Sequence, residues 1–223
     1  MIESIDPLTN DKIIFKKQKQ SFVYALVSYL IVFPIFRILF RGRTIGNANV
    51  PTYGPLVVVA NHGSDLDPPI LGHALGRPVL FMAKKELFLI PLLAQIIRAC
   101  GAYPVSRGSS DKDAIRTATN LLTQGCAIGL FLDGTRQLDG RVNQPMSGAA
   151  LLAARSGATL LPVAIINSHR AWGKSKYPRL VPIHLRIGEP IQPPKSKRKA
   201  DLAETTNQLK LIINGLIDKG LDS

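Results

Sequence analysis

The stretch Val57-Val58-Val59-Ala60-Asn61-His62-Gly63-Ser64-Asp65-Leu66-Asp67-Pro68 places a histidine and two carboxylates directly after a short apolar run. Four consecutive apolar residues are typical of a strand that is covered on both faces. Turn-forming residues follow, and Asp67-Pro68 favours the start of a helix with Asp67 as its N-cap. The stretch therefore predicts a strand, a polar loop and a helix, with His62 at the carboxyl end of the strand, where open α/β sheets carry their chemistry.

On both sides of this stretch, short apolar runs alternate with helical patterns. Such alternation predicts an α/β fold with a central, largely parallel or mixed sheet flanked by helices. The expected strands are 56–60, 79–83, 102–105, 127–132, 159–166 and 181–187, and the expected helices are 68–75, 91–99, 112–123, 147–154 and a C-terminal amphipathic helix at 201–219.

The N-terminal part of the chain differs in composition from the rest. Residues 21–36 carry no charged side chain, and Arg37, Arg41 and Arg43 follow them. As a helix this run would be roughly 24 Å long, shorter than the roughly 30 Å hydrocarbon core of a bilayer. Pro34 is expected to bend or end the helix.

These features predict an N-terminal membrane-associated helix that lies in or on the bilayer, with its basic residues near anionic headgroups. We divide the chain accordingly into a membrane-associating segment, residues 1–43, and one α/β domain, residues 44–223. A single membrane span and a buried core helix are the alternatives that the pattern leaves open.

Composition narrows the choice of partners. The formal net charge is +13, which attracts nucleic acid, an anionic membrane surface or phosphorylated substrates. The few aromatic residues gather in the N-terminal apolar run, which leaves little for stacking on bases, so we expect no nucleic-acid partner. Cys100 and Cys126 lie in apolar surroundings without zinc-ligand spacing, which predicts buried thiols in a reducing compartment and no metal site.

Three more polar clusters follow expected strands. Residues 101–108 include Arg107, residues 131–136 end in Arg136, and residues 161–165 lead towards His169. Guanidinium groups bind phosphate through two parallel hydrogen bonds. Two arginines beside a histidine–carboxylate loop therefore indicate a phosphate-bearing substrate.

In this order the four clusters resemble the motif blocks of the 1-acylglycerol-3-phosphate acyltransferases (lysophosphatidate acyltransferases) of the wider glycerolipid acyltransferase family. His62 and Asp67 match the family's His-x4-Asp box, and residues 101–107, 133–136 and 161–163 match its next three blocks. The resemblance covers about residues 51–163. It implies acyl transfer from acyl-CoA or acyl-carrier protein to the hydroxyl of a lysophospholipid, above all 1-acylglycerol-3-phosphate to give phosphatidic acid, with no cofactor.

Physical reasoning and the resemblance agree on the roles in the first block. A neutral imidazole, with an ordinary pKa of about 6.5, suits His62 as the general base that takes the hydroxyl proton. A carboxylate on the other ring nitrogen fixes the tautomer; the spacing leaves Asp65 and Asp67 equivalent, and the family pattern selects Asp67. Without a Gly-x-Ser-x-Gly elbow, Ser64 is a disfavoured nucleophile. Backbone N–H groups near Gly63 or at the helix start are candidate oxyanion donors.

The resemblance assigns Arg107 and Arg136 to the acceptor's phosphate, and places Asp133, Gly134 and Thr135 in the same substrate site. Asp133 stands where the family usually has Glu, which leaves open another lysophospholipid acceptor. A thioester hydrolase and a lipid-binding protein without catalysis are the competing functions. The expected partners are membrane lipids, the lysophospholipid and the acyl donor, and the expected location is the cytoplasmic face of a membrane.

Overall fold

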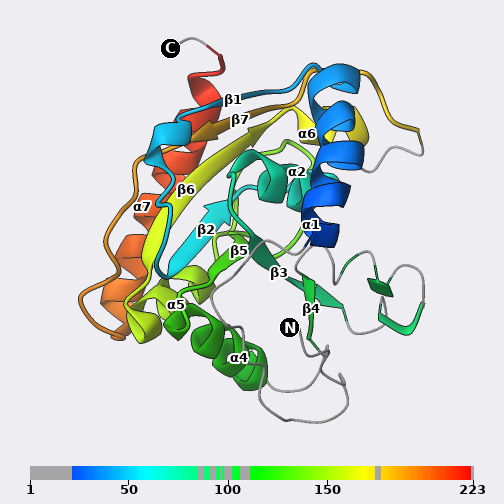
Figure 1. Cartoon of the computed structure of the whole chain (residues 1–223). Coiled ribbons are helices and arrows are strands. Elements are labelled where there is room, and N and C mark those ends of the chain that lie inside the picture. Colours follow the sequence, from blue (N-terminus) through cyan, green and yellow to red (C-terminus); the bar gives the residue numbers. More distant parts are fainter. Residues whose placement is uncertain are drawn as a thin grey trace.

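The computed structural model describes residues 22–84, 88–90, 94–95, 97, 102–105, 111–173 and 177–221. In this part of the chain seven strands form one mixed sheet in the order β1-β7-β6-β2-β5-β3-β4 (Figure 1). Strands β2 to β6 run parallel to one another, β7 runs antiparallel to β6, and β1 is parallel to β7. The predicted α/β fold with a largely parallel sheet is confirmed. The strands are β1 (Arg43–Ile45), β2 (Leu56–Ala60), β3 (Val79–Lys84), β4 (Ala102–Val105), β5 (Ala127–Phe131), β6 (Thr159–Ile166) and β7 (His184–Ile187).

Strand β2 lies at the centre of the sheet, between β5 and β6, and all five of its residues are fully buried. Its side chains alternate between two hydrophobic clusters, as the pleat of a strand requires. Val58 and Ala60 belong to one cluster, and Val57 and Val59 to the other. The apolar run is therefore covered on both faces, as predicted.

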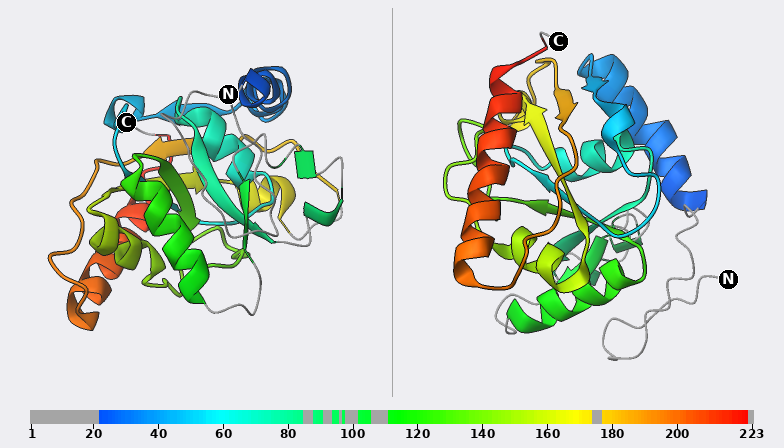
Figure 2. Two further views of the ribbon diagram at one scale, coloured as in Figure 1. Left: turned by 60° about the horizontal axis from the view of Figure 1, so that its bottom comes forward. Right: turned by 90° about the vertical axis from the view of Figure 1, so that its left-hand side faces the viewer.

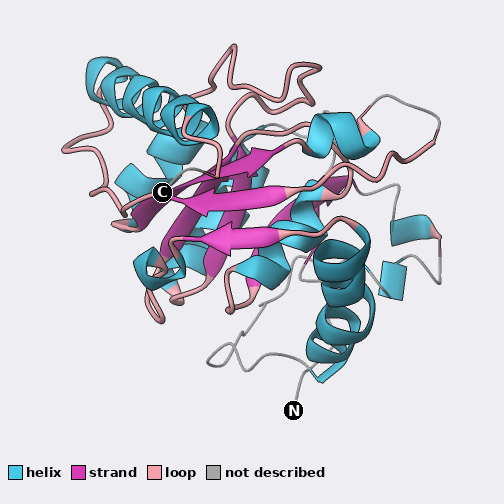
Figure 3. Cartoon of the chain, turned by 90° about the horizontal axis from the view of Figure 1, so that it is seen from above, coloured by secondary structure: helices cyan, strands magenta, loops and turns pink. Residues whose placement is uncertain are grey.

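Helices cover the two faces of the sheet separately (Figures 2 and 3). Helix α2 (Asp67–Ala74) and the N-terminal helical segment pack on one face, while α4 (Asp111–Thr123), α5 (Gly148–Ser156) and α7 (Lys199–Asp218) pack on the other. In α7 the apolar stripe is anchored by Leu209 and Ile213, both fully buried. A short helix, α6 (Ser168–Trp172), follows β6.

The N-terminal helical segment consists of α1 (Phe22–Val27) and two π-helical stretches, η1 (Ser28–Val32) and η2 (Ile35–Leu39). Pro34 does not end the helix. A π-helical stretch lies on each side of it, and this local change in helical winding accommodates the proline. Of the described helices, none is both long and apolar enough to cross a membrane. Phe36 and Phe40 are buried in the core, so the division of the chain at residue 43 stays a proposal.

Several predicted boundaries differ from the observed ones. The strand expected at 181–187 is ordered as β7 only over its last four residues, and β1 and α6 were not predicted. A 3-10 turn, η3 (Asn47–Asn49), follows β1. The helix expected at 91–99 lies mostly outside the described residues, as does Cys100. Cys126 is buried, and burial raises the pKa of its thiol.

Candidate active site

The loop between β2 and α2 brings His62 and Asp67 into contact. The Nδ1 atom of His62 lies 2.9 Å from Oδ2 of Asp67. Because an ionised carboxylate can only accept a hydrogen bond, Nδ1 carries the proton and donates it to Asp67. Nε2 is then left with its lone pair on a side chain that is 15% exposed. The geometry therefore presents one basic nitrogen to a reactant.

Asp67 is fully buried, and Oδ2 also accepts the backbone N–H groups of Gly63 at 2.7 Å and Ser64 at 2.8 Å. The expectation that Asp67 is the N-cap of the helix is wrong. The cap position belongs to Leu66, and the carboxylate turns back onto the preceding loop. A side-chain cap is less necessary here because two prolines occupy the first turn and lack N–H groups.

The same contacts affect the predicted oxyanion donors. The N–H groups of Gly63 and Ser64 already donate to Asp67, and Pro68 and Pro69 have none. The N–H of Leu66 donates to the Ser64 hydroxyl. These backbone groups hold the loop in shape, so they are not free to bind an oxyanion in this conformation.

Ser64 is fully buried and serves the fold of the loop. Its hydroxyl donates to the carbonyl of Trp172 at 2.6 Å and accepts the N–H of Leu66 at 3.2 Å. This links the loop to the end of α6. A buried hydroxyl that donates to a backbone carbonyl is poorly placed to attack a thioester, in agreement with the disfavoured role of Ser64 as a nucleophile.

The imidazole of His62 rests on an aromatic ring that the sequence did not single out. The ring of Phe131, at the end of β5, stacks on it with a centroid separation of 3.9 Å and an interplanar angle of 13°. Phe81 in β3 stacks in turn on Phe131 at 6.0 Å. The Phe81 ring lies over Gly129, where an added Cβ would come within 2.2 Å of it. A glycine in β5 thus makes room for the aromatic support of the histidine.

Asn61 fixes the position at which β2 ends. Its amide group donates to the carbonyls of Gly140 at 2.6 Å and Ile165 at 2.8 Å, and its Oδ1 accepts the N–H of Ile165 at 2.7 Å. The side chain is fully buried. Sequence reasoning missed this role, although an amide directly before the histidine was the available signal.

Arg136 lies at the same end of the sheet and forms an ion pair with Asp65. Asp65 is 83% exposed at its side chain, whereas Asp67 is fully buried, so the two carboxylates of the loop have different partners. The chain after Arg136 is tied to the loop, because the N–H of Gln137 donates to the carbonyl of His62 at 2.8 Å. The other predicted phosphate ligand, Arg107, lies outside the described residues.

The other residues of the third block, Asp133, Gly134 and Thr135, differ in how exposed they are to solvent. The carboxylate of Asp133 is nearly buried and accepts the N–H groups of Gln144 at 2.7 Å and Asn143 at 3.2 Å. Gly134 and Thr135 are exposed beside it. Substrate contacts by these three residues stay a prediction; the observed contacts of Asp133 close the loop at residues 143–144.

His169 in α6 packs between two glycines beside the loop. An added Cβ on Gly63 would meet the Cβ of His169 at 2.8 Å, and one on Gly140 would meet Nδ1 at 2.1 Å. Burial, and then the charge of Arg170, lower the pKa of His169. The closely packed, neutral imidazole of His169 therefore forms one side of the site at the β2–α2 loop.

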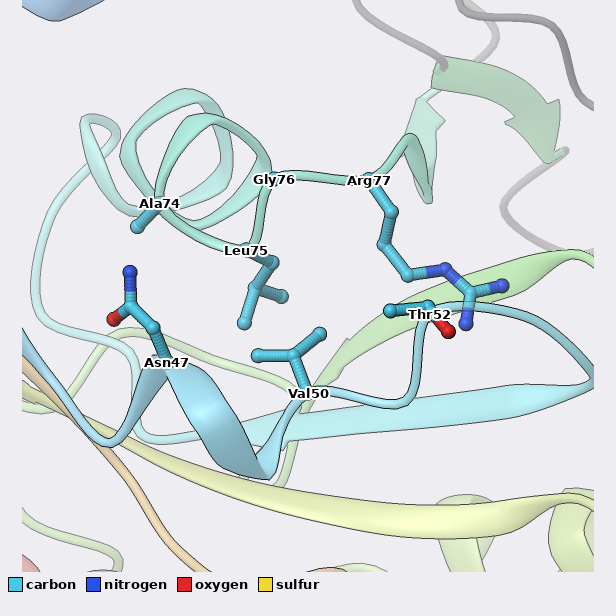
Figure 4. Close-up of a pocket in the computed structure, with 7 residues that line it drawn as sticks. All are labelled: Asn47, Val50, Thr52, Ala74, Leu75, Gly76 and Arg77. Atoms are coloured by element: carbon cyan, nitrogen blue, oxygen red, sulfur yellow. The ribbon is translucent and has the colours of Figure 1, made fainter.

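Among the described residues, no cluster of three or more His, Cys, Asp or Glu side chains has the arrangement of a metal site. A pocket of about 310 Å³ lies at the opposite end of the sheet from His62, between Val50 and Leu75 (Figure 4). Arg77 lines it, but its guanidinium donates to the carbonyls of Pro51, Gly54 and Gly125, so this arginine supports the turns there.

The chain matches the family described as "Acyltransferase" over residues 41–166, which contain the β2–α2 loop and the third block. It is 30% identical over 174 residues to the 1-acyl-sn-glycerol-3-phosphate acyltransferase of Bacillus subtilis, a match that covers 74% of this chain and 84% of that protein. The chain belongs to the acyltransferase family.

Other relatives are longer. The chain is 28% identical over 157 residues to the chloroplastic 1-acyl-sn-glycerol-3-phosphate acyltransferase LPAT1 of Arabidopsis thaliana, covering 69% of this chain and 43% of that one. It thus spans about half the length of the first curated relatives that it matches. Among solved structures, the 1-acyl-sn-glycerophosphate (LPA) acyltransferase PlsC of Thermotoga maritima aligns with a TM-score of 0.74 at 24% identity, over 92% of this chain and 82% of that one. This likeness supports the fold.

Proposed function

We propose that the protein is a 1-acylglycerol-3-phosphate acyltransferase, which moves a fatty acyl group from acyl-CoA or acyl-carrier protein to the free hydroxyl of its acceptor and so makes phosphatidic acid. The observation that carries the proposal is the contact between His62 and the buried Asp67 at the end of β2. Family membership and the names of the relatives support the same activity.

In this proposal Nε2 of His62 is the general base. It takes the proton of the acceptor hydroxyl as the oxygen attacks the thioester carbonyl, and the imidazolium returns the proton to the sulfur of the leaving thiol. Asp67 holds the tautomer and stabilises the imidazolium. General base catalysis of this kind contributes about 10²–10⁴-fold. No acyl-enzyme forms, in keeping with the buried hydroxyl of Ser64.

The acceptor's phosphate is proposed to bind Arg136, together with Arg107. Arg136 is paired with the exposed Asp65. Exposed ion pairs contribute at most about 1 kcal/mol, whereas a phosphate offers two parallel charge-assisted hydrogen bonds. The substrate phosphate is therefore proposed to replace Asp65 as the partner of the Arg136 guanidinium.

The N-terminal helical segment is proposed to lie on the membrane. Two of its polar side chains face the protein: the Tyr24 hydroxyl donates to the carbonyl of Gly72, and the Ser28 hydroxyl lies 2.7 Å from Nδ1 of His73. Seven of its large apolar side chains face outward, whereas Phe36 and Phe40 pack in the core. This inverts the usual arrangement of a helix on a water-soluble surface and suits a lipid environment. The exposed apolar side chains are Leu26, Tyr29, Leu30, Ile31, Phe33, Ile38 and Leu39.

We further propose that the segment docks on the cytoplasmic face of a membrane, where acyl-CoA and acyl-carrier protein are both accessible. Its contacts with α2, the helix that starts at Asp67, support this proposal because they connect the segment to the element that carries the partner of the proposed base. The reaction as written needs no cofactor and no metal ion.

A panel of acceptors tests the function. Purified protein receives radiolabelled acyl-CoA or acyl-carrier protein together with 1-acylglycerol-3-phosphate, another lysophospholipid, or no acceptor. We expect labelled phosphatidic acid as the main product and little free fatty acid without acceptor. Faster transfer to another lysophospholipid would change the acceptor, and undiminished release of fatty acid without acceptor would identify a thioester hydrolase.

A further inference from the structure

A second basic site lies away from His62, where the helical segment passes into β1. A pocket of about 640 Å³ opens there, and Arg37, Arg41 and Arg43 line it. The remaining lining residues are Gly42, Thr44, Ile45 and Leu221, so none of the described residues contributes an acidic side chain to it. Figure 1 shows β1 leaving the end of the helical segment and crossing towards the C-terminal end of α7.

The charges of these three arginines are not neutralised by the described part of the chain. None of the three forms an ion pair there; Arg37 donates to the carbonyl of Gly42 at 2.8 Å and Arg41 to that of Leu180 at 3.3 Å. The positive charges of two of these arginines lower the pKa of nearby imidazoles. After burial, the charge of Arg37 lowers the pKa of His73, and that of Arg43 lowers the pKa of His184. Among the described residues, the pocket therefore presents a cationic surface without an acidic partner.

The backbone conformation of Arg41 is a second indication that the pocket binds a ligand. Its φ is 47°, in the left-handed region that glycine adopts without strain. The position follows the end of η2 and closes it, because the N–H of Gly42 donates to the carbonyl of Phe36 at 2.7 Å. Glycine is the usual residue at such a helix end. An arginine here costs stability that a glycine would not, and its exposed guanidinium makes one long contact, to the carbonyl of Leu180, within the described part of the chain.

The surroundings of the pocket identify the ligand class. The exposed Ile38 and Leu39 lie between Arg37 and Arg41 in the chain, and the carbonyl that Arg41 contacts belongs to Leu180, whose side chain is 60% exposed. Leu221 adds an exposed apolar side chain to the pocket itself. A free phosphate ester would use the guanidinium groups alone, whereas a phospholipid uses both the cationic and the apolar surface.

We propose that the pocket at Arg37, Arg41 and Arg43 binds the phosphate of an anionic phospholipid, separately from the substrate site at Arg136. The inference rests on the proposed membrane contact of the helical segment. Planar guanidinium groups donate two parallel hydrogen bonds to a pair of phosphate oxygens, which a lysine cannot reproduce. The site anchors the protein on membranes that contain anionic lipid.

Co-sedimentation with vesicles tests the site. The full chain is mixed with vesicles of phosphatidylcholine alone and of phosphatidylcholine with phosphatidylglycerol. We expect Arg43→Ala to lower the partition coefficient on the mixed vesicles about fivefold, and to leave it unchanged on phosphatidylcholine. Arg43→Lys keeps the charge and is expected to lose several-fold as well, because the planar fork is gone.

Two variants separate binding from folding and from general electrostatics. Arg41→Gly relieves the left-handed strain, so its Tm is expected to rise or hold while binding to mixed vesicles falls. Arg155→Ala removes an exposed arginine on α5 and is the matched control. An equal loss for Arg155→Ala, or full binding by Arg43→Lys, would overturn the pocket in favour of a diffuse surface potential.

Two further arms identify the source of the phosphate and keep the result independent of catalysis. Soluble glycerol 3-phosphate, added at constant ionic strength, is expected not to displace the protein from mixed vesicles; displacement would mean that the pocket takes a free phosphate ester. His62→Ala is expected to bind vesicles like the wild type. Acyl transfer in neutral detergent micelles is expected to survive Arg43→Ala, so either proposal can fail without the other.

Discussion

The β2–α2 loop and the N-terminal helical segment place their polar and apolar groups in opposite ways. In the loop, the polar side chains of Asn61, Ser64 and Asp67 are buried and bonded to the protein. In the helical segment, apolar side chains such as Leu30 face outward. The loop is therefore determined by contacts within the chain, whereas the segment leaves an apolar surface exposed, which we propose faces lipid.

Helix α2 connects the two regions. It begins at Asp67, and near its end Gly72 and His73 contact Tyr24 and Ser28 of the helical segment. The loop that holds His62 and Asp67 is thereby connected to the apolar surface that we propose faces lipid. The comparison predicts that substitutions in the loop affect turnover and folding, and that outward substitutions in the segment affect membrane binding alone.

The largest effect, a loss of turnover, is expected for Asp67→Ala. It removes the acceptor for His62 Nδ1 and leaves two buried N–H groups unpaired, so kcat is expected to fall about 10²–10⁴-fold. Steady-state kinetics of acyl transfer measures this. Asp65→Asn is the control: kcat is expected to stay within a few-fold, and the acceptor KM to fall because Arg136 is released. The reverse ranking would contradict the assignment of Asp67.

Asn61→Ala is expected to have the next largest effect, on folding. It leaves the carbonyls of Gly140 and Ile165 and the N–H of Ile165 without their partner. Each unpaired buried group costs about 1–3 kcal/mol, so the free energy of unfolding is expected to drop by several kcal/mol in total. Urea denaturation measures the loss, and a change of less than about 1 kcal/mol would show that the site is not held in this way.

In the helical segment, Leu30→Glu is expected to weaken vesicle binding by about ten- to a hundred-fold, since a buried leucine contributes roughly 1.5–3 kcal/mol. The free energy of unfolding is expected to change little, because Leu30 is 66% exposed. Leu211→Glu, on the outer face of α7 and 73% exposed, is the matched control and should leave binding unaltered. Equal losses for both variants would remove the distinction between the two faces.

The smallest effect concerns His73, where the two regions meet. Burial, and then the charge of Arg37, lower its pKa, so the unfolded chain binds a proton that the folded chain resists. Stability is therefore expected to decline as the pH falls below about 6.5. Urea unfolding between about pH 7.5 and pH 5.5 measures the slope, and His73→Gln should reduce it. An unchanged slope would show that His73 does not contribute.

Much of the fold follows from local patterns. The apolar runs at β2, β4 and β6 are long enough to predict strands with the observed bounds. Strand β1 has three residues, of which only Ile45 is apolar, and is ordered by pairing with β7. Such a strand depends on a distant partner, so the local sequence carries no signal for it.

The site was predictable as a set of residues but only partly as a geometry. The family's motif pattern selected His62 and Asp67, where spacing alone left Asp65 and Asp67 open, and the fold brings His62 and Asp67 together. The direction of the Asp67 carboxylate depends on the backbone of the loop, and the support from Phe131 depends on the register of β5 against β2. Both are long-range properties. The proposal that Arg136 changes its partner from Asp65 to a substrate phosphate likewise depends on an ion pair that the sequence does not reveal.

The most direct test of the account compares the wild type with His62→Ala, measuring acyl transfer to 1-acylglycerol-3-phosphate and vesicle binding on the same preparations. The account predicts a loss of about 10²–10⁴-fold in kcat with vesicle binding retained. Transfer within a few-fold of the wild type would contradict the role of His62 as the base.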